Sequence, residues 1–339
     1  MSTLDTDLDA IVRPVIADGL ELTRARTAAV GDMSVRRLLP LRLRRSVGAW
    51  CFIDHYGPMS VDGVTGMAVP PHPHIGLQTV TWLMAGNVLH RDSLGSEQMI
   101  RPGQLNLMTA GRGIAHAEES PAEHDPLLHG VQLWVALPDA SRLTEPDFEH
   151  HAELPVTKLG GLAITVLLGS LAGPPGAPWG PGGSGAPRLR SPATTFSDIV
   201  GAELVAATDA RELIALEPSF EHAVFVTSGA ASVAGTELAP GSLLYLPPGR
   251  DILTVMASAG TAAMLLGGVP LGERLLMWWN FVARTPQEIA AAVAGWQQGM
   301  FGEVGGYAGP PLAPPPLDAA RLARRARVAR QTGEISLPN

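Results

Sequence analysis

The stretch Pro71–Trp82, PHPHIGLQTVTW, is the most informative part of this sequence. Its second half is rich in β-branched and aromatic residues, which is typical of a β-strand. His72 and His74 are two residues apart, so an extended backbone would point both imidazoles to one face. A single histidine in an apolar strand is more often a hydrogen-bonded core residue. The pair therefore leaves two interpretations open, a core position and a metal site.

A second pair with the same spacing shifts the balance towards metal. His116 and Glu118 lie in TAGRGIAHAEES (109–120), where glycines permit a sharp turn. If the two strands line one pocket, three imidazoles and one carboxylate meet there. Such a set suits one divalent ion, Fe(II), Mn, Ni, Cu or Zn, and leaves open positions for a bidentate substrate or for substrate and O2.

Short strand-like runs with Gly, Pro, Asn and Asp between them predict an all-β fold of antiparallel sandwiches or barrels. In the first half these runs are 77–84, 104–109 and 131–137; from residue 213 onward the same rhythm resumes. The region around Glu221-His222 and the turn 247–249 fall roughly where the first half carries its two pairs. Only one histidine stands there, so we expect a duplicated barrel in which one copy keeps the metal.

The chain divides into two expected domains and a tail. The first domain, 1–155, binds the metal; the second, 156–305, contains a Gly/Pro-rich loop at 171–195. One helix is expected near the end of the second domain. Thr285 at its N-cap, Pro286 at N1 and Glu288 at N3 form a capping box, and the helix should end before Gly302.

The remaining residues, 306–339, form a Pro-rich and then basic tail containing ARLARRARVAR. We expect this tail to be solvated or partly disordered, and a contact with a protein or an anionic surface is the alternative.

Composition excludes several classes of protein. The 339 residues carry a formal net charge of −8, so no overall basic field favours nucleic acid. Cys51 is the only cysteine, so no internal disulfide can form, and its apolar surroundings predict a core position. Neither a signal peptide nor a run of about 18 apolar residues is evident. A cytoplasmic monomer without membrane contact is therefore expected.

Longer motifs in the chain resemble those of the pirins, which are bicupin proteins of the cupin superfamily. The resemblance covers about residues 20 to 305. It implies two antiparallel cupin β-barrels with a metal only in the N-terminal one, held by His72, His74, His116 and Glu118, with Fe(II) expected. The motifs that carry it are IDHYGP (53–58), PHPHIGLQTVTW (71–82), HRDSLG (90–95), PGQLNLMTAGRGIAHAE (102–118) and PLGERLLMWWNFVARTPQEI (270–289).

One position departs from the general cupin pattern. Gln78 stands where that pattern places a glutamate ligand, and a neutral amide cannot replace a carboxylate as charge donor. We expect Gln78 to line the pocket or to support the ligands. An apolar wall formed by Trp82, Leu107 and Met108, or by their neighbours, would exclude water.

Other polar residues are weaker candidates. His90 and Asp92 could orient the ligands through hydrogen bonds or simply close a turn. Arg112 could reach an anionic substrate or pair with a carboxylate. For Asp54 and His55, which precede a Gly-Pro turn, the same two interpretations stay open, a role in the site and a place in the turn. The remaining histidines of the first half are expected on the surface: His124, His129, His150 and His151.

The resemblance implies two alternative functions. One is a quercetin 2,3-dioxygenase: a flavonol binds the metal through its 3-hydroxyl, Glu118 takes the proton as the catalytic base, and O2 reacts at C2 with loss of carbon monoxide. The other is a non-catalytic, iron- or redox-sensing binder of a regulatory protein. A closed apolar cavity leading to the metal favours catalysis, whereas a metal at a flat charged surface favours sensing.

Overall fold

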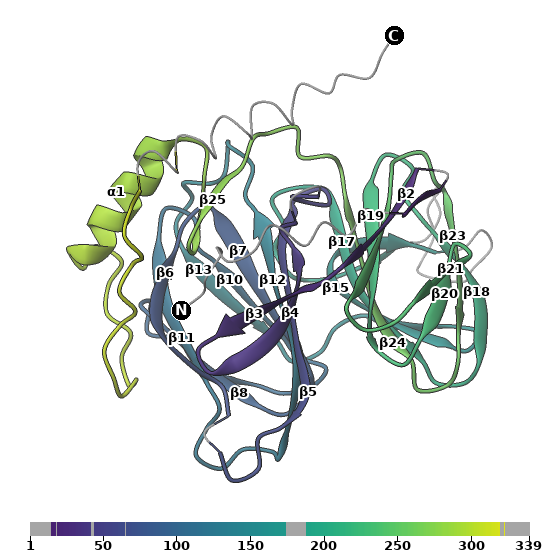
Figure 1. Cartoon of the computed structure of the whole chain (residues 1–339), viewed down its shortest axis with the longest axis horizontal. Coiled ribbons are helices and arrows are strands. Elements are labelled where there is room, and N and C mark those ends of the chain that lie inside the picture. The colour runs from purple at the N-terminus through teal and green to yellow at the C-terminus, as the bar shows by residue number, and fades with distance from the viewer. Residues whose placement is uncertain are drawn as a thin grey trace.

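The computed structural model describes residues 15–17, 19–41, 44–64, 66–173, 188–318 and 322. Two β-barrels lie side by side, and the helix packs on the side of the first barrel away from the second (Figure 1). The predicted all-β bicupin fold with one short C-terminal helix is confirmed. Among the described residues, no helix has the length and apolar character needed to cross a bilayer.

The first barrel consists of two antiparallel sheets that enclose a cavity. The larger sheet has seven strands in the order β13 (Asp147–His151), β10 (Leu105–Thr109), β7 (Leu77–Ala85), β12 (Leu127–Ala136), β5 (Trp50–Ser60), β4 (Met33–Leu39) and β3 (Arg26–Val30). The smaller sheet has four strands in the order β6 (Ala68–His74), β11 (Ile114–Glu119), β8 (Val88–Asp92) and β9 (Glu97–Ile100).

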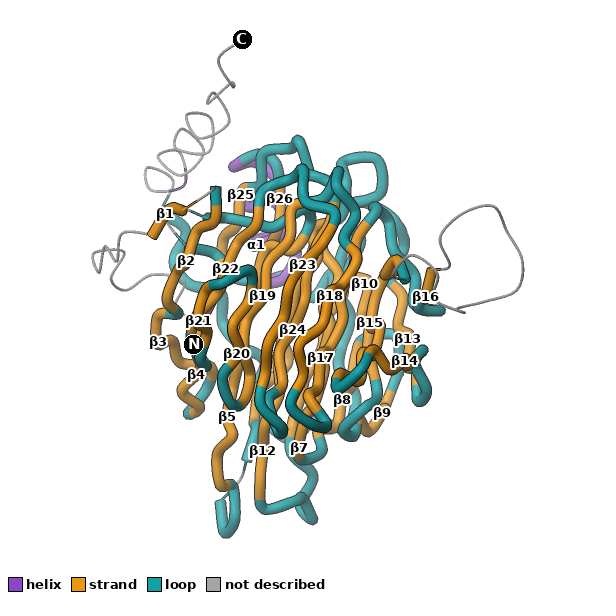
Figure 2. The backbone as a smooth tube through the Cα atoms, turned by 90° about the vertical axis from the view of Figure 1, so that its right-hand side faces the viewer, coloured by secondary structure: helices purple, strands orange, loops and turns teal. Residues whose placement is uncertain are grey.

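The second barrel repeats this plan and faces the viewer in Figure 2. That sheet runs β1 (Val15–Ala17), β2 (Leu20–Arg24), β22 (Ser242–Leu246), β19 (Glu221–Ser228), β24 (Ala262–Gly268), β17 (Ile199–Ala206), β15 (Leu162–Ala172) and β14 (Val156–Leu159), with β16 (Arg188–Arg190) beside β15. The smaller sheet runs β18 (Ala210–Ala215), β23 (Ile252–Ala257), β20 (Ala231–Val233) and β21 (Thr236–Leu238).

The two larger sheets pack back to back, and this contact decides which residues face the cavity. Trp82 and Leu133 of the first barrel share one buried cluster with Phe225 and Leu266 of the second. Because side chains alternate along a strand, the neighbours of Trp82 and Leu133 point into the first barrel, and those of Phe225 and Leu266 point into the core of the second. The strands of the larger sheet are therefore buried on both faces.

Strand pairing departs from the expected limits of one domain and of one loop. Strand β2, in the range expected for the first domain, pairs with β22 of the second barrel. The expected 171–195 loop is shorter than predicted, because residues 171–172 end β15 and 188–190 form β16, hydrogen-bonded to each other. Its central part, 174–187, lies outside the described residues.

The C-terminal segment returns to the first barrel as a hairpin and a helix. The hairpin, β25 (Leu276–Trp278) and β26 (Phe281–Ala283), forms a bridge from Phe281 to Ile75 at the end of β6. Helix α1 (Pro286–Gln297) follows, and its predicted cap is confirmed: the Thr285 hydroxyl accepts a hydrogen bond from the Glu288 amide at 3.3 Å.

The described part of the expected tail is largely exposed, as predicted, but leucines anchor it to the first barrel and the helix. The Leu312 amide donates to the Pro71 carbonyl at 2.8 Å, and the Trp296 indole donates to the Leu312 carbonyl at 2.8 Å. Leu322 is 3% exposed in the same cluster as the helix, so apolar burial explains the difference. The rest of the basic stretch lies outside the described residues.

Docking of the hairpin can be tested at Gly76, which has a φ of +69°. A Cβ there would collide with the Val282 carbonyl of β26, whereas a Cβ on Gly95, with a φ of +90°, would meet nothing within 4 Å. Both Gly→Ala changes carry a left-handed backbone penalty of about 1–2 kcal/mol. Gly76→Ala should lower the free energy of unfolding in urea by a further 1–3 kcal/mol or so. Equal losses for the two variants would contradict this contact.

Candidate metal centre

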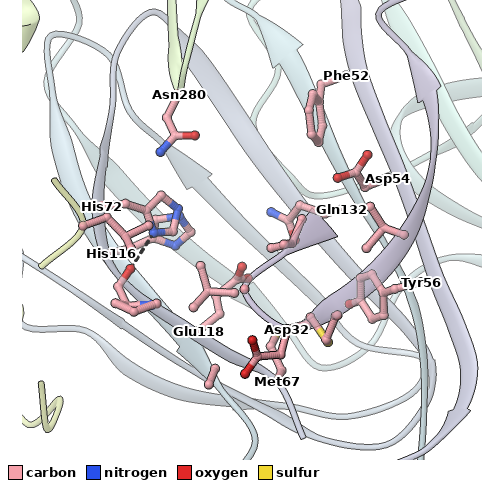
Figure 3. Close-up of a pocket in the computed structure, with 18 of the residues that line it drawn as sticks. Asp32, Phe52, Asp54, Tyr56, Met67, His72, His116, Glu118, Gln132 and Asn280 are labelled. Carbon is pink, nitrogen blue, oxygen red and sulfur yellow. Dashed lines mark hydrogen bonds between the residues drawn. The ribbon is translucent and has the colours of Figure 1, made fainter. Parts of the chain in front are cut away.

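Three histidines of the smaller sheet converge at one point. His72 and His74 lie on β6, and His116 on the adjacent β11 is paired in register with His72. One ring nitrogen from each lies within 4.8 Å of the others. All three side chains are buried, and Figure 3 shows His72 and His116 at the left of the cavity. The structure therefore brings together three of the four predicted ligands.

Two of the rings have their Nδ1 atoms committed to carbonyl groups. His72 Nδ1 lies 2.8 Å from the Pro70 carbonyl oxygen, and His74 Nδ1 lies 3.0 Å from that of Asn280. A carbonyl oxygen only accepts, so each Nδ1 carries the proton. In the neutral rings Nε2 is then a bare lone pair.

The position of the proton on the third ring, His116, depends on two further residues, Asp92 and His90. Asp92 Oδ1 accepts from the Leu94 and Ser96 amides at 2.9 and 3.0 Å, and its Oδ2 lies 3.2 Å from His90 Nε2. That contact needs a proton on His90 Nε2, so the Nδ1 of a neutral His90 accepts. His116 Nδ1, 3.5 Å away, then carries its own proton and leaves Nε2 bare.

This proton assignment makes the centre suitable for a cation. His116 Nε2 lies 3.1 Å from His74 Nε2, so two lone pairs face each other with no proton between them. Burial lowers the pKa of His72 to about 4 and holds the pKa values of His74 and His116 well below the usual range. Neutral imidazoles are the metal-binding form, and a divalent ion would satisfy all three lone pairs. The residues present therefore fit a divalent metal ion.

Glu118 lies beside this trio but is not equidistant from its members. A carboxylate oxygen of Glu118 and one ring nitrogen each of His116 and His90 lie within 4.8 Å of one another. Among the described residues, no such cluster joins Glu118 to His72 and His74. The Thr81 hydroxyl donates to Glu118 Oε1 at 2.9 Å. Burial raises the pKa of Glu118, while His90 and the Thr81 hydrogen bond oppose the shift. A buried carboxyl of this kind therefore keeps its proton to a higher pH than an exposed glutamate does.

The centre opens into a cavity of about 310 Å³ between the two sheets of the first barrel. Figure 3 shows His72 and His116 on one side and Phe52, Asp54 and Tyr56 on the other. The volume is at the small end of the range for ligand pockets. Apolar side chains make up much of the lining: Val30, Met33, Val35, Phe52, Met67, Val69, Trp134 and Leu312.

The expected apolar wall was wrong in its residues. Thr81 of β7 points towards Glu118, so Trp82, one residue on, faces the second barrel, as does Leu107 of β10. Met108 packs behind Phe52 and Trp134 and does not line the cavity. Gln78, three residues before Thr81, also points away; its amide donates to the Thr109 hydroxyl and the Thr194 carbonyl.

The other candidates separate according to strand face. Asp54 points into the cavity, whereas His55 points to the opposite face, where its Nε2 lies 2.9 Å from that of His129. His129 is 7% exposed, so its expected surface position was wrong, because the second barrel covers it. Arg112 is exposed and pairs with Glu145 at 2.5 Å, away from the cavity. His124, His150 and His151 are partly exposed.

Sequence reasoning missed six polar residues around the cavity. Alternation along IDHYGP (53–58) could have identified Tyr56 and Asp54 as one face of a strand. For Asn280 no local signal exists, because the hairpin brings it from far along the chain. The six are Asp32, Arg37, Tyr56, Thr81, Gln132 and Asn280.

Comparison with known proteins identifies the family. The family models "Pirin" and "Pirin C-terminal cupin domain" match residues 32–135 and 202–302. A Pseudomonas aeruginosa protein named as a proposed quercetin 2,3-dioxygenase is 45% identical over 88% of this chain and 90% of its own. The chain belongs to the pirin family. The predicted family is thus confirmed.

Two solved pirin-type structures extend the comparison. The crystal structure of a quercetin 2,3-dioxygenase from Acinetobacter baumannii is 39% identical, with a TM-score of 0.81 over 88% of this chain and 96% of that chain. A bacterial pirin from Escherichia coli in complex with nickel(II) is 17% identical, with a TM-score of 0.55 over 74% of this chain and 99% of that chain. The second likeness concerns the fold alone.

The chain from Asp92 through His90 to His116 predicts a measurable effect on metal affinity. In Asp92→Asn the Leu94 and Ser96 amides retain the carbonyl oxygen, so an NH2 group replaces the oxygen that accepts from His90 Nε2, and His116 loses its orientation. We expect metal affinity to fall roughly 10–100-fold in a competition titration with a chelator. Asp209→Asn is a matched control, because Asp209 also accepts from a backbone amide, that of Ala259 at 3.0 Å, but lies in the second barrel. Equal affinities for the two variants would refute the chain.

Removal of a ligand should abolish metal loading. His74→Ala takes away one of three converging lone pairs, and elemental analysis of the purified variant should find the site empty. His151→Ala, whose ring contacts Glu149 at 3.0 Å outside the cavity, should keep wild-type content. Full occupancy in His74→Ala would disprove the site. The fold should persist, because both barrels have large apolar cores.

Proposed function

We propose that this pirin is a metal-dependent dioxygenase that opens the ring of a flavonol such as quercetin with O2. One observation carries the proposal: the candidate metal centre is buried and opens into a largely apolar cavity of about 310 Å³. The names of its relatives from Pseudomonas and Acinetobacter point in the same direction.

The proposed ligands are His72, His74, His116 and Glu118, holding one divalent ion, with Fe(II) first and Ni, Mn, Cu or Zn as alternatives. Such a cation would lower the pKa of a chelating hydroxyl and favour its ionised form. The imidazoles are pre-oriented by their Nδ1 hydrogen bonds, so little reorganisation accompanies loading. Asn280, from the C-terminal hairpin, lies on the same side of the cavity as His72 (Figure 3).

Glu118 is the proposed base. Its Oε1 is occupied by the Thr81 hydroxyl, which leaves Oε2 to accept the proton of the substrate hydroxyl. Its raised pKa improves the match between base and hydroxyl. Phe52 and Trp134, stacked with centroids 4.0 Å apart, present an apolar surface that keeps water from the reacting ring.

The alternative is a non-catalytic redox sensor that binds a regulatory protein. Such a sensor needs its ion to alter an accessible surface. His74 and His116 are each 1% exposed, which favours chemistry inside a cavity over signalling at a surface. A pull-down whose yield depends on the oxidation state of bound iron would support the sensor.

Oxygen consumption tests the enzymatic proposal. Protein loaded with iron or nickel should consume O2 with quercetin faster than free metal at the same concentration, and turnover no faster than free metal would refute it. Glu118→Gln should lower turnover about 10²–10⁴-fold at equal metal content. Glu119→Gln is the matched control, because the next carboxylate on β11 pairs with Arg91 outside the cavity. Similar losses in both variants would exclude the base role.

A further inference from the structure

A buried ion pair lies at the end of the cavity opposite the histidines. Arg37 donates through Nε and Nη2 to the two carboxylate oxygens of Asp54, at 2.7 and 2.6 Å. The side chains are 0% and 4% exposed. Figure 3 shows Asp54 facing the cavity across from His72 and His116. A buried pair with spare hydrogen-bonding capacity is costly unless something else completes it.

Two buried polar atoms of the cavity lining have no partner among the described residues. One is Arg37 Nη1, which carries two unused N–H groups; the other is the hydroxyl oxygen of Tyr56. Both residues line the cavity, and Tyr56 is 2% exposed. Gly130 makes room for the Tyr56 hydroxyl, because a Cβ there would lie 2.5 Å from it. Buried donors are rarely left unsatisfied, so a partner from outside the chain is expected.

The pair belongs to a polar row that runs across four strands towards the metal centre. Arg37 of β4 is directly opposite Asp54 of β5, and Asp54 is opposite Gln132 of β12. Gln132 is in turn opposite Thr81 of β7, which bonds Glu118. At about 4.8 Å per strand, the row spans on the order of 14 Å. The cavity thus has polar groups at both ends.

We propose that Arg37, Asp54 and Tyr56 form a recognition site for a phenolic hydroxyl on the ring of the substrate remote from the metal. A hydroxyl both donates and accepts, so it satisfies the free lone pairs of Asp54 and the free N–H groups of Arg37 together. A carboxylate or phosphate would match Arg37 but meet the negative charges of Asp54 and Glu118. The inference rests on the proposed function only in taking the ligand to be a flavonol.

Equilibrium binding under nitrogen tests the site without turnover. The probes are quercetin, with several ring hydroxyls, and 3-hydroxyflavone, which has the chelating hydroxyl alone; fluorescence quenching of nickel-loaded protein gives both dissociation constants. The wild type should prefer quercetin. Arg37→Met/Asp54→Leu, which replaces the pair by apolar groups, should reduce that preference about tenfold or more and leave 3-hydroxyflavone nearly unchanged.

Matched variants keep the outcome clear. Arg112→Met/Glu145→Leu removes an exposed pair and should keep the wild-type preference. Tyr56→Phe tests the site should the double variant fold poorly, and it should lose part of the same preference. Equal changes for both probes, or no preference in the wild type, overturn the inference. A normal preference for quercetin without O2 consumption would refute only the proposed function. O2 consumption without that preference would refute only this inference.

Discussion

The candidate site depends on one constraint: the protons of three buried imidazoles are all committed away from their meeting point. Pro70 and Asn280 hold the Nδ1 protons of His72 and His74, and the Asp92–His90 pair holds that of His116. Three lone pairs are then left facing one another in a medium that disfavours imidazolium. A divalent cation would satisfy these three lone pairs, and the other polar groups of the cavity lie around this point.

The back-to-back packing of the two larger sheets places the other functional groups. Because the outer face of the seven-stranded sheet is buried against the second barrel, its inner face is free to carry polar residues over a cavity. The second barrel thus contributes support rather than ligands. The C-terminal hairpin supplies the Asn280 carbonyl, so the metal centre is completed by a segment some 200 residues away from His74.

Local patterns in the sequence predicted the strands, the capped helix and the convergence of His72, His74 and His116, because these follow from backbone periodicity. The same reasoning failed for Trp82 and Leu107. Strand β7 is buried on both faces, so apolar alternation does not tell the cavity from the interface between barrels. Arg37 and Asn280 were missed for another reason: strand register and hairpin docking, which no local motif encodes, bring them to the site.

Anomalous diffraction from a crystal of the protein loaded with nickel or iron tests the central claim most directly. The account predicts one strong peak within coordination distance, about 2.0–2.2 Å, of the Nε2 atoms of His72, His74 and His116. Glu118 should lie beside this peak, with His90 bound to Asp92 rather than to the ion. A peak between His90 and Glu118, or no peak in the cavity, would contradict it.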